Sequence, residues 1–166
     1  MQFQSSGLSV RSSHPSDADS LKSWLSDPNI LSWFPMMNER EVEDSVKIWM
    51  SYAKLGYGLT ALMDGKPCGM LNLYIQPFTK IAHTCLFSII VAQSLRGKGI
   101  GTFLIERGQT LAKETFAIEI LHLEVYDGNP AQRLYEKMGF TVYGKQDFFI
   151  KEDGKYLSKI FMQKML

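Results

Sequence analysis

The segment of the chain best suited to chemistry lies between residues 91 and 102 and is rich in glycine. Three glycines alternate with a lysine and an isoleucine behind an arginine, in the run Arg96, Gly97, Lys98, Gly99, Ile100, Gly101 and Thr102. An apolar stretch that ends at Val91 precedes this run, and a stretch with helical periodicity follows it. The first turn of a helix carries unpaired N–H groups and a partial positive charge, and glycine lets a large anion approach the backbone. The run therefore predicts a pyrophosphate-binding site.

Two common nucleotide-binding loops do not fit this spacing. A P-loop requires G-x-x-x-x-G-K-[ST], and the sequence has no such run. A dinucleotide-binding G-x-G-x-x-G would need glycine where the sequence has Thr102 or Leu104. A tight turn whose glycines serve only packing is the structural alternative. The pattern that remains is R-x-x-G-x-G, formed by Arg96, Gly99 and Gly101.

A second pattern occupies residues 123–140. A strand-like run leads to an asparagine, then to Leu-Tyr in a helical stretch, then to Gly-Phe, at positions Asn129, Leu134, Tyr135, Gly139 and Phe140. With both patterns in this order, the chain resembles the GNAT superfamily of acyl-CoA N-acetyltransferases. Its tail further resembles the branch that includes ribosomal-protein and polyamine acetyltransferases. The resemblance is detailed over residues 85–143, and the order of the elements extends it along the chain.

The resemblance implies that acetyl-CoA is the co-substrate and indicates where it lies. Backbone amides across residues 96–102 would hold its pyrophosphate. The backbone near Val91 would run beside its pantetheine arm, as an added strand would. Asn129 would cap the helix that follows, ahead of Pro130, and would also contact the arm of the co-substrate.

Acyl transfer to an amine poses two proton problems. An alkylamine, with a pKa of about 10, must lose a proton before it attacks, and the departing CoA thiolate gains from protonation. By resemblance Tyr135 is the general acid, although its place on an apolar helical stripe also fits a packed core tyrosine. Glu124, on a strand face opposite apolar neighbours, is the candidate base. The alternatives are a solvent-facing strand end, a chain of waters, and His83 as the base.

The acceptor side is expected in residues 27–37, which are rich in aromatic residues and methionine between two predicted helices. By family analogy, this region and the final hairpin flank the acceptor. The candidate acceptor-side residues are Trp33, Phe34, Met36, Met37 and His83. Those in residues 27–37 either wall a pocket or pack the two helices together. Two acceptors remain open, namely a small amine or amino-acid-like molecule and a protein N-terminus.

Two functions from other classes also remain open. A non-catalytic acyl-CoA sensor with the same fold would keep the glycine-rich loop but would not need Tyr135. A nucleotide-binding regulator would be stabilised by ATP rather than by acetyl-CoA. The presence of both patterns favours catalysis.

The elements that must position these residues follow from hydrophobic periodicity. Strands are expected at 7–13, 58–64, 68–76, 81–91, 118–126, 140–150 and 156–166, and helices at 17–26, 39–54, 99–115 and 130–138. A short apolar turn is expected at 30–34. The order β-α-α-β-β-β-α-β-α-β-β contains one right-handed parallel crossover. It predicts a GNAT-type α/β (α+β) fold, with a mixed central sheet of about seven strands and helices on both faces.

Length and composition set the frame for this fold. The 166 residues suit a single domain over residues 1–166. A net charge of +1 argues against nucleic-acid partners, and no apolar run approaches a membrane span. Cys68 and Cys85 are expected as buried thiols, and the scattered histidines give no metal-ligand spacing, so no metal site is expected. The N-terminus lacks the features of a secretion signal, which favours the cytoplasm; a monomer and a homodimer both remain open.

Overall fold

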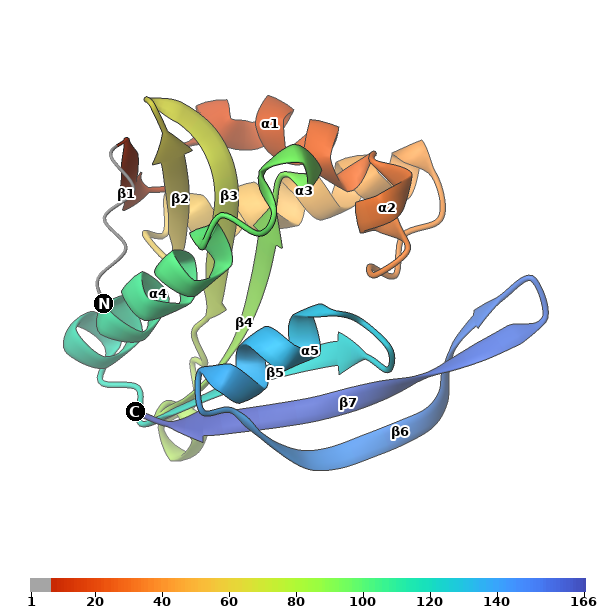
Figure 1. Cartoon of the computed structure of the whole chain (residues 1–166). Helices are drawn as coiled ribbons and strands as arrows, with labels where there is room; N and C mark the ends of the chain where they lie inside the picture. Colours follow the sequence, from red (N-terminus) through yellow and green to blue (C-terminus); the bar gives the residue numbers. More distant parts are fainter. Residues whose placement is uncertain (1–6) are drawn as a thin grey trace.

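The computed structural model describes residues 7–166 and contains a seven-stranded mixed sheet in the order β1-β2-β3-β4-β5-β7-β6 (Figure 1). The strands are β1 Leu8–Ser12, β2 Gly58–Met63, β3 Lys66–Tyr74, β4 Thr84–Val91, β5 Ile120–Tyr126, β6 Thr141–Glu152 and β7 Lys155–Met165. The helices are α1 Ala18–Leu25, α2 Pro28–Leu31, α3 Glu39–Lys54, α4 Ile100–Phe116 and α5 Ala131–Lys137. The mixed sheet and the order of its elements confirm the predicted fold class. The N-terminal stretch Met1–Ser6, which bore on the expected absence of a secretion signal, lies outside the described residues.

The sheet carries an apolar core on each face, because alternate residues of a strand point to opposite sides. One core packs α4 and α5 against side chains that include Leu71 and Phe87. The other packs α1, α2 and α3 against Met70 and Ile90. Adjacent residues of β3 thus enter different cores, and helices cover both faces as predicted (Figure 1). Among the helices of residues 7–166, none has the length and apolar character needed to cross a membrane.

Helix α4 lies close to the sheet because glycines remove side chains at the contact. A Cβ atom at Gly108 would lie 2.9 Å from Leu71 Cδ1 of β3. A Cβ atom at Gly69 would lie 3.0 Å from Leu104 Cδ1 of α4. The two glycines therefore seat the helix against β3, which in turn fixes where its N-terminus lies.

The sheet divides into two halves at the parallel pair β4–β5. Three residue pairs join these strands, namely Thr84 with Ile120, Cys85 with Leu121, and Leu86 with His122. Beyond them β4 continues to Val91 and β5 to Tyr126 without further pairing to each other. The strands splay apart there, so residues 87–91 have a strand partner on one side and an open edge on the other (Figure 1).

Most predicted boundaries agree with the structure to within two residues, and two elements have a boundary that differs by more. Strand β4 begins at Thr84 rather than at residue 81, because Thr79–Ile81 form a 3-10 turn. The apolar turn expected at 30–34 overlaps helix α2, which begins earlier, at Pro28, and ends at Leu31. The Asp27 side chain caps this helix. Apolar residues occur in the turns as well as in the elements beside them, so composition alone did not separate the two.

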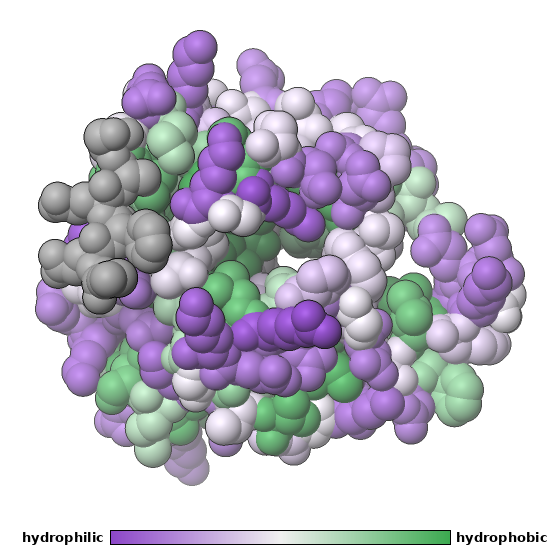
Figure 2. Space-filling view, viewed as in Figure 1, coloured by the Kyte–Doolittle hydropathy of each residue, from purple (hydrophilic) through white to green (hydrophobic). Residues whose placement is uncertain are grey.

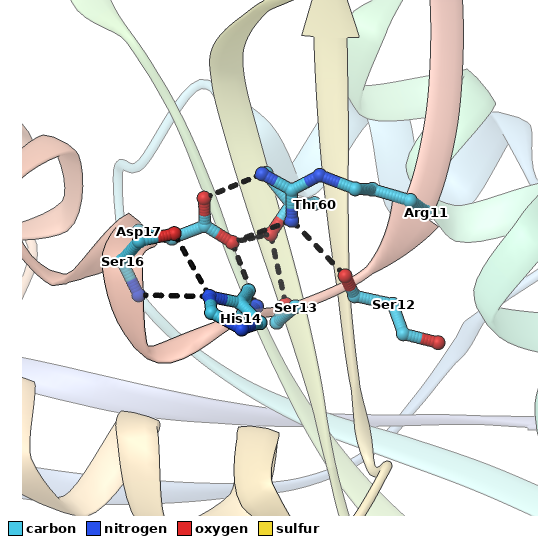
Figure 3. Close-up of polar contacts among 7 residues, drawn as sticks. All are labelled: Arg11, Ser12, Ser13, His14, Ser16, Asp17 and Thr60. Atoms are coloured by element: carbon cyan, nitrogen blue, oxygen red, sulfur yellow. Dashed lines mark hydrogen bonds and ion pairs between the residues drawn. The ribbon is translucent and has the colours of Figure 1, made fainter.

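A buried carboxylate ties the first strand to β2 and to the start of α1 (Figure 3). Asp17 is 2% exposed and accepts hydrogen bonds from the two terminal nitrogens of Arg11 at 2.8 and 2.7 Å. It also accepts from the Thr60 hydroxyl at 2.8 Å and from the His14 N–H at 2.9 Å. Burial by itself would raise the pKa of Asp17, but these hydrogen bonds outweigh it and hold the pKa below its ordinary value. One ionised carboxylate thus connects three elements.

Strands β6 and β7 form a long hairpin that projects beyond the rest of the sheet (Figure 1). Its register shifts between Gln146 and Ile150, so the residues between them stand opposite Ser158 alone. Within this bulge Phe148 has a φ of 58° and is 74% exposed, whereas Phe149 is 36% exposed. A bulge of this kind re-aims side chains and often lies beside a ligand site.

Candidate active site

The glycine-rich run forms the turn between β4 and α4. Gly97 and Gly99 have φ values of 77° and 79°, in the left-handed region that side chains rarely adopt, and a Cβ atom at either position would meet nothing within 4 Å. Gly99 is the N-cap of α4 and offers no side-chain cap. Within residues 7–166, the first amide of α4 to find an acceptor is that of Phe103, which donates to Gly99 O at 3.0 Å. The preceding amides are therefore available to an anion.

Positive charge surrounds this turn. Arg96 and Lys98 are exposed, and neither forms an ion pair in the described part of the chain. The dipole of the 17-residue α4 adds a partial positive charge at the same place. A Cβ atom at Gly101 would lie 3.0 Å from Leu134 Cδ2, so this glycine lets α5 approach the turn. The backbone, charges and open space fit the pyrophosphate of acetyl-CoA.

The open edge of β4 begins at this turn and leads away from it. Residues 87–91 pair with β3 on one side and, past Leu86, have no strand from residues 7–166 on the other. An extended molecule with amide groups, such as a pantetheine arm, can pair with such an edge as an added strand does. The edge near Val91 and the turn that follows it thus have the form that a pantetheine arm and its phosphates require.

Tyr135 lies on α5 beside this edge. Its ring packs edge-to-face against Phe87 of β4, with centroids 6.3 Å apart, and against Phe140 at 6.2 Å. Tyr135 is 7% exposed, so its ring is part of the packed core whether or not its hydroxyl also acts in catalysis. Burial raises the pKa of Tyr135 to about 12, although the charge of Arg96 lowers it. The phenol is therefore neutral at physiological pH and able to donate its proton.

Glu124 lies on β5 past the last β4–β5 pair and forms an ion pair that the sequence did not reveal. Its Oε2 accepts a hydrogen bond from Lys159 Nζ at 2.6 Å. The Glu124 side chain is 40% exposed and that of Lys159 only 11%. Lys159 stands opposite Tyr126 in the β5–β7 register, which makes it a diagonal neighbour of Glu124. In the sequence, the position of Lys159 next to the apolar Ile160 indicates a charged residue close to the core. Only the strand register identifies Glu124 as its partner.

Two histidines lie near the paired residues of β4 and β5. His122 is half-buried on the Glu124 face of β5, and burial lowers its pKa while Glu124 raises it, with a net decrease. His83, expected on the strand before the loop, precedes β4 instead. Its carbonyl accepts from Ile120 N–H at 3.1 Å, at the end of β4 away from Val91. The structure therefore does not bring His83 to the glycine-rich turn.

Asn129 lies two residues before the first residue of α5, and its side chain caps the first turn of that helix as predicted. Its Oδ1 accepts from the Ala131 N–H at 3.0 Å, and its carbonyl accepts from the Gln132 N–H at 3.1 Å. Pro130 occupies the cap position before the first helical residue. The Asn129 Nδ2 group is not used in this cap and has no acceptor within residues 7–166, which leaves it able to donate to a ligand.

In the described part of the chain, the two cysteines form no disulfide and the metal-binding side chains form no metal site. Cys68 and Cys85 are buried and free, as expected. Burial raises the pKa of the Cys85 thiol to about 12, so it stays protonated. Within residues 7–166, no three or more His, Cys, Asp or Glu side chains are grouped so that they could hold a metal ion.

A cavity of about 260 Å³ lies between the segment that follows α2 and the far end of the β6–β7 hairpin. Its walls include Phe34, Met36 and Met37 from one side and Phe149 from the other. Phe34 and Met36 also pack on the core of α1, α2 and α3, so they serve both expected roles. Trp33, which is also predicted on the acceptor side, is not among the described residues that line the cavity. Figure 2 shows the molecule hollowed between the half that carries α1–α3 and the half that carries α5 and the hairpin.

Known proteins share this arrangement. The acetyltransferase (GNAT) family model matches residues 18–140. The L-amino acid N-acetyltransferase AaaT of Escherichia coli (strain K12) is 24% identical over 108 residues, which are 64% of this chain and 67% of that protein. The structure of yncA from Salmonella typhimurium, solved with its cofactor acetyl-CoA, superimposes with a TM-score of 0.79 and 22% identity, covering 96% of this chain and 94% of that one. The ribosomal-protein-alanine N-acetyltransferase from Brucella melitensis gives a TM-score of 0.80 and 25% identity, covering 95% and 99%.

Proposed function

Because the chain belongs to the acetyltransferase (GNAT) family, we propose that it acetylates an α-amine by direct attack in a complex that holds both acetyl-CoA and the acceptor. N-Acetyltransferase activity follows from the family, and the acceptor and the order of events are the proposal. One relative is named for L-amino acids and another for the alanine of a ribosomal protein. Both names refer to an α-amine, so the acceptor we propose is a free amino acid or a protein N-terminus.

The observation that carries the proposal is that three features converge on the end of β4. The glycine-rich turn offers unpaired amides, and the strand before it offers an open edge. Tyr135 packs against Phe87, a residue of that same edge. This packing supports Tyr135 as the proton donor for an acyl group delivered along the strand.

Acetyl-CoA supplies an acyl group activated as a thioester. During transfer the acceptor nitrogen forms a bond to the acyl carbon as the carbon–sulfur bond breaks. The ammonium gives its first proton to Glu124, and the second nitrogen proton leaves to water after the new bond forms. Tyr135 donates its proton to the departing sulfur and recovers one from solvent. Each residue thus addresses one of the two proton problems of the reaction.

The direct test is release of free thiol from acetyl-CoA with a panel of amines, L-amino acids and N-terminal peptides. Thiol release with at least one α-amine is the expected result. Tyr135→Phe is expected to lower kcat by about 100-fold, because a thiolate is already a fair leaving group, while stabilisation by acetyl-CoA is kept. Tyr143→Phe, a change at an exposed tyrosine of β6, serves as the matched control.

Two results would reject this function. Stabilisation by acetyl-CoA without thiol release from any acceptor would identify a sensor of the same fold. Stabilisation by ATP alone would identify a nucleotide-binding regulator.

A further inference from the structure

Lys159 holds a mostly buried charge that, among the described residues, is paired with one carboxylate, that of Glu124. The residue is 9% exposed, and a buried ammonium is costly unless it is paired and hydrogen-bonded. An ammonium has three N–H donors, but within residues 7–166 Lys159 uses one, to Glu124 at 2.6 Å. The rings of Phe149 and Phe161 lie 3.6 and 5.5 Å from its nitrogen and offer no strong acceptor. The remaining donors suit an anionic ligand.

The position of the pair places such a ligand between the two halves of the site. Glu124 lies on β5 beyond the last residue pair with β4, beside the open edge. Phe149 contacts the Lys159 ammonium and also forms part of the cavity wall. The hairpin bulge that contains Phe149 is what turns this ring inward. The ion pair therefore stands between the open edge of β4 and the cavity.

We propose that Glu124 and Lys159 recognise the α-amino acid group of the acceptor, with Lys159 binding its carboxylate and Glu124 its ammonium. The inference rests on the proposed function and narrows the acceptor to a free α-amino acid. The pair presents one negative and one positive group side by side, and a zwitterion presents the same two charges in reverse. The ligand carboxylate satisfies the spare donors of Lys159 with charge-assisted hydrogen bonds. Glu124 then exchanges its lysine partner for the ammonium whose proton it must take.

A protein N-terminus fits this pair less well. Its α-amine can approach Glu124, but the group beside it is an uncharged amide carbonyl. Lys159 would then lose part of its pairing to Glu124 without gaining an anion in return. The pair therefore favours the free amino acid over the peptide.

The test compares acceptors that differ only at the carboxylate. Thiol release is measured with the proteinogenic L-amino acids, then with the best of them, its carboxamide and its decarboxylated amine. The wild-type protein is expected to prefer the amino acid by roughly 10- to 100-fold in kcat/KM, the range of a charge-assisted hydrogen bond. Lys159→Met is expected to bring the three acceptors to about equal kcat/KM, and Lys159→Arg to keep the preference. Stabilisation by acetyl-CoA checks that each variant is folded.

Lys145→Met is the matched control, because Lys145 is an exposed lysine of the same hairpin that pairs with Asp127 and Asp147. It is expected to keep the wild-type preference. A wild-type protein that uses the amino acid and its carboxamide equally, or a preference that survives Lys159→Met, overturns the assignment. Thiol release from carboxamides or peptides in that case still supports acetyl transfer. Failure of every acceptor rejects the proposed function itself.

Discussion

Tyr135 keeps its proton over a wider range of pH than an ordinary tyrosine. Burial raises its pKa to about 12, despite the nearby Arg96, from the usual value near 10. A general acid works below its pKa, so a raised pKa extends its working range upward. We expect kcat, measured with saturating substrates, to show no tyrosine-linked decline up to about pH 10.5. A decline centred near pH 10 that disappears in Tyr135→Phe would contradict this.

Glu124→Gln removes the proton acceptor while keeping the shape of the side chain. We expect kcat to fall by roughly 100-fold or more, within the range for a lost general base, with the affinity for acetyl-CoA unchanged. Titration of acetyl-CoA binding and steady-state kinetics measure the two quantities. Glu119→Gln is the control, because Glu119 is exposed and precedes β5. Unchanged turnover in Glu124→Gln would show that water, and not Glu124, deprotonates the acceptor ammonium.

The sequence singles out candidate site residues that belong to a local motif, but it does not single out a residue that is defined by its partner. Asn129 and Tyr135 were singled out because their spacing to Gly139 and Phe140 repeats a known pattern. Lys159 belongs to no motif, and its contact with Glu124 depends on how β7 pairs with β5. Register sets cross-strand neighbours, and the sequence pattern gave only the face on which each residue lies.

The turn before α4 depends on glycine for two separate reasons, which a pair of substitutions can distinguish. Gly99→Ala places a methyl group at a left-handed φ of 79° and also in the open space where an anion would lie. Gly65→Ala imposes the same backbone strain at the same φ, with the same open space, in the turn between β2 and β3. We expect each to destabilise the fold by about 1 kcal/mol. Gly99→Ala alone should weaken acetyl-CoA binding, measured by calorimetry, by roughly 10-fold or more.

Equal weakening by the two variants would show that strain, and not the anion site, accounts for the loss. Unchanged binding in Gly99→Ala would remove the turn from the binding site.

Long elements were predictable and their junctions were not. The helix over residues 39–54 agrees at both ends with α3, because its apolar residues recur with helical spacing and Asn38 caps it. The strand expected from residue 81 starts later, since Ile81 ends a 3-10 turn rather than beginning the strand. The splay of β4 from β5 and the bulge before Ile150 arise from pairing between distant segments. No periodicity within one segment encodes them.

The whole domain is expected to lose stability in acid through Asp17. The folded pKa of this carboxyl is below its unfolded value of about 3.9, so its contribution is present above that pH and is lost as the pH falls through the folded pKa. At pH 7, Asp17→Asn should lower the free energy of unfolding by about 2 kcal/mol, because Arg11 and Thr60 lose a charged partner. Below about pH 4 the wild-type and variant curves should converge.

Chemical denaturation at several pH values measures this difference. Asp44→Asn is the control, because Asp44 is exposed and its one ion pair within residues 7–166 is with Lys47, one turn along α3. It should change stability little at any pH. A gap between wild type and Asp17→Asn that stays constant from pH 7 to pH 3 would show that Asp17 contributes by shape rather than by charge.

The splay between β4 and β5 also predicts how the centre of this sheet exchanges its amide hydrogens with deuterium. Central strands ordinarily exchange slowest, because their amides are released only by global unfolding. In β4, the amides of residues 87–91 that point away from β3 have no strand acceptor, and they should exchange as fast as those of an outer strand. A bound acyl-CoA arm would slow them selectively. Deuterium uptake by the innermost strand of the fold would then report how much of the enzyme is carrying its acyl donor.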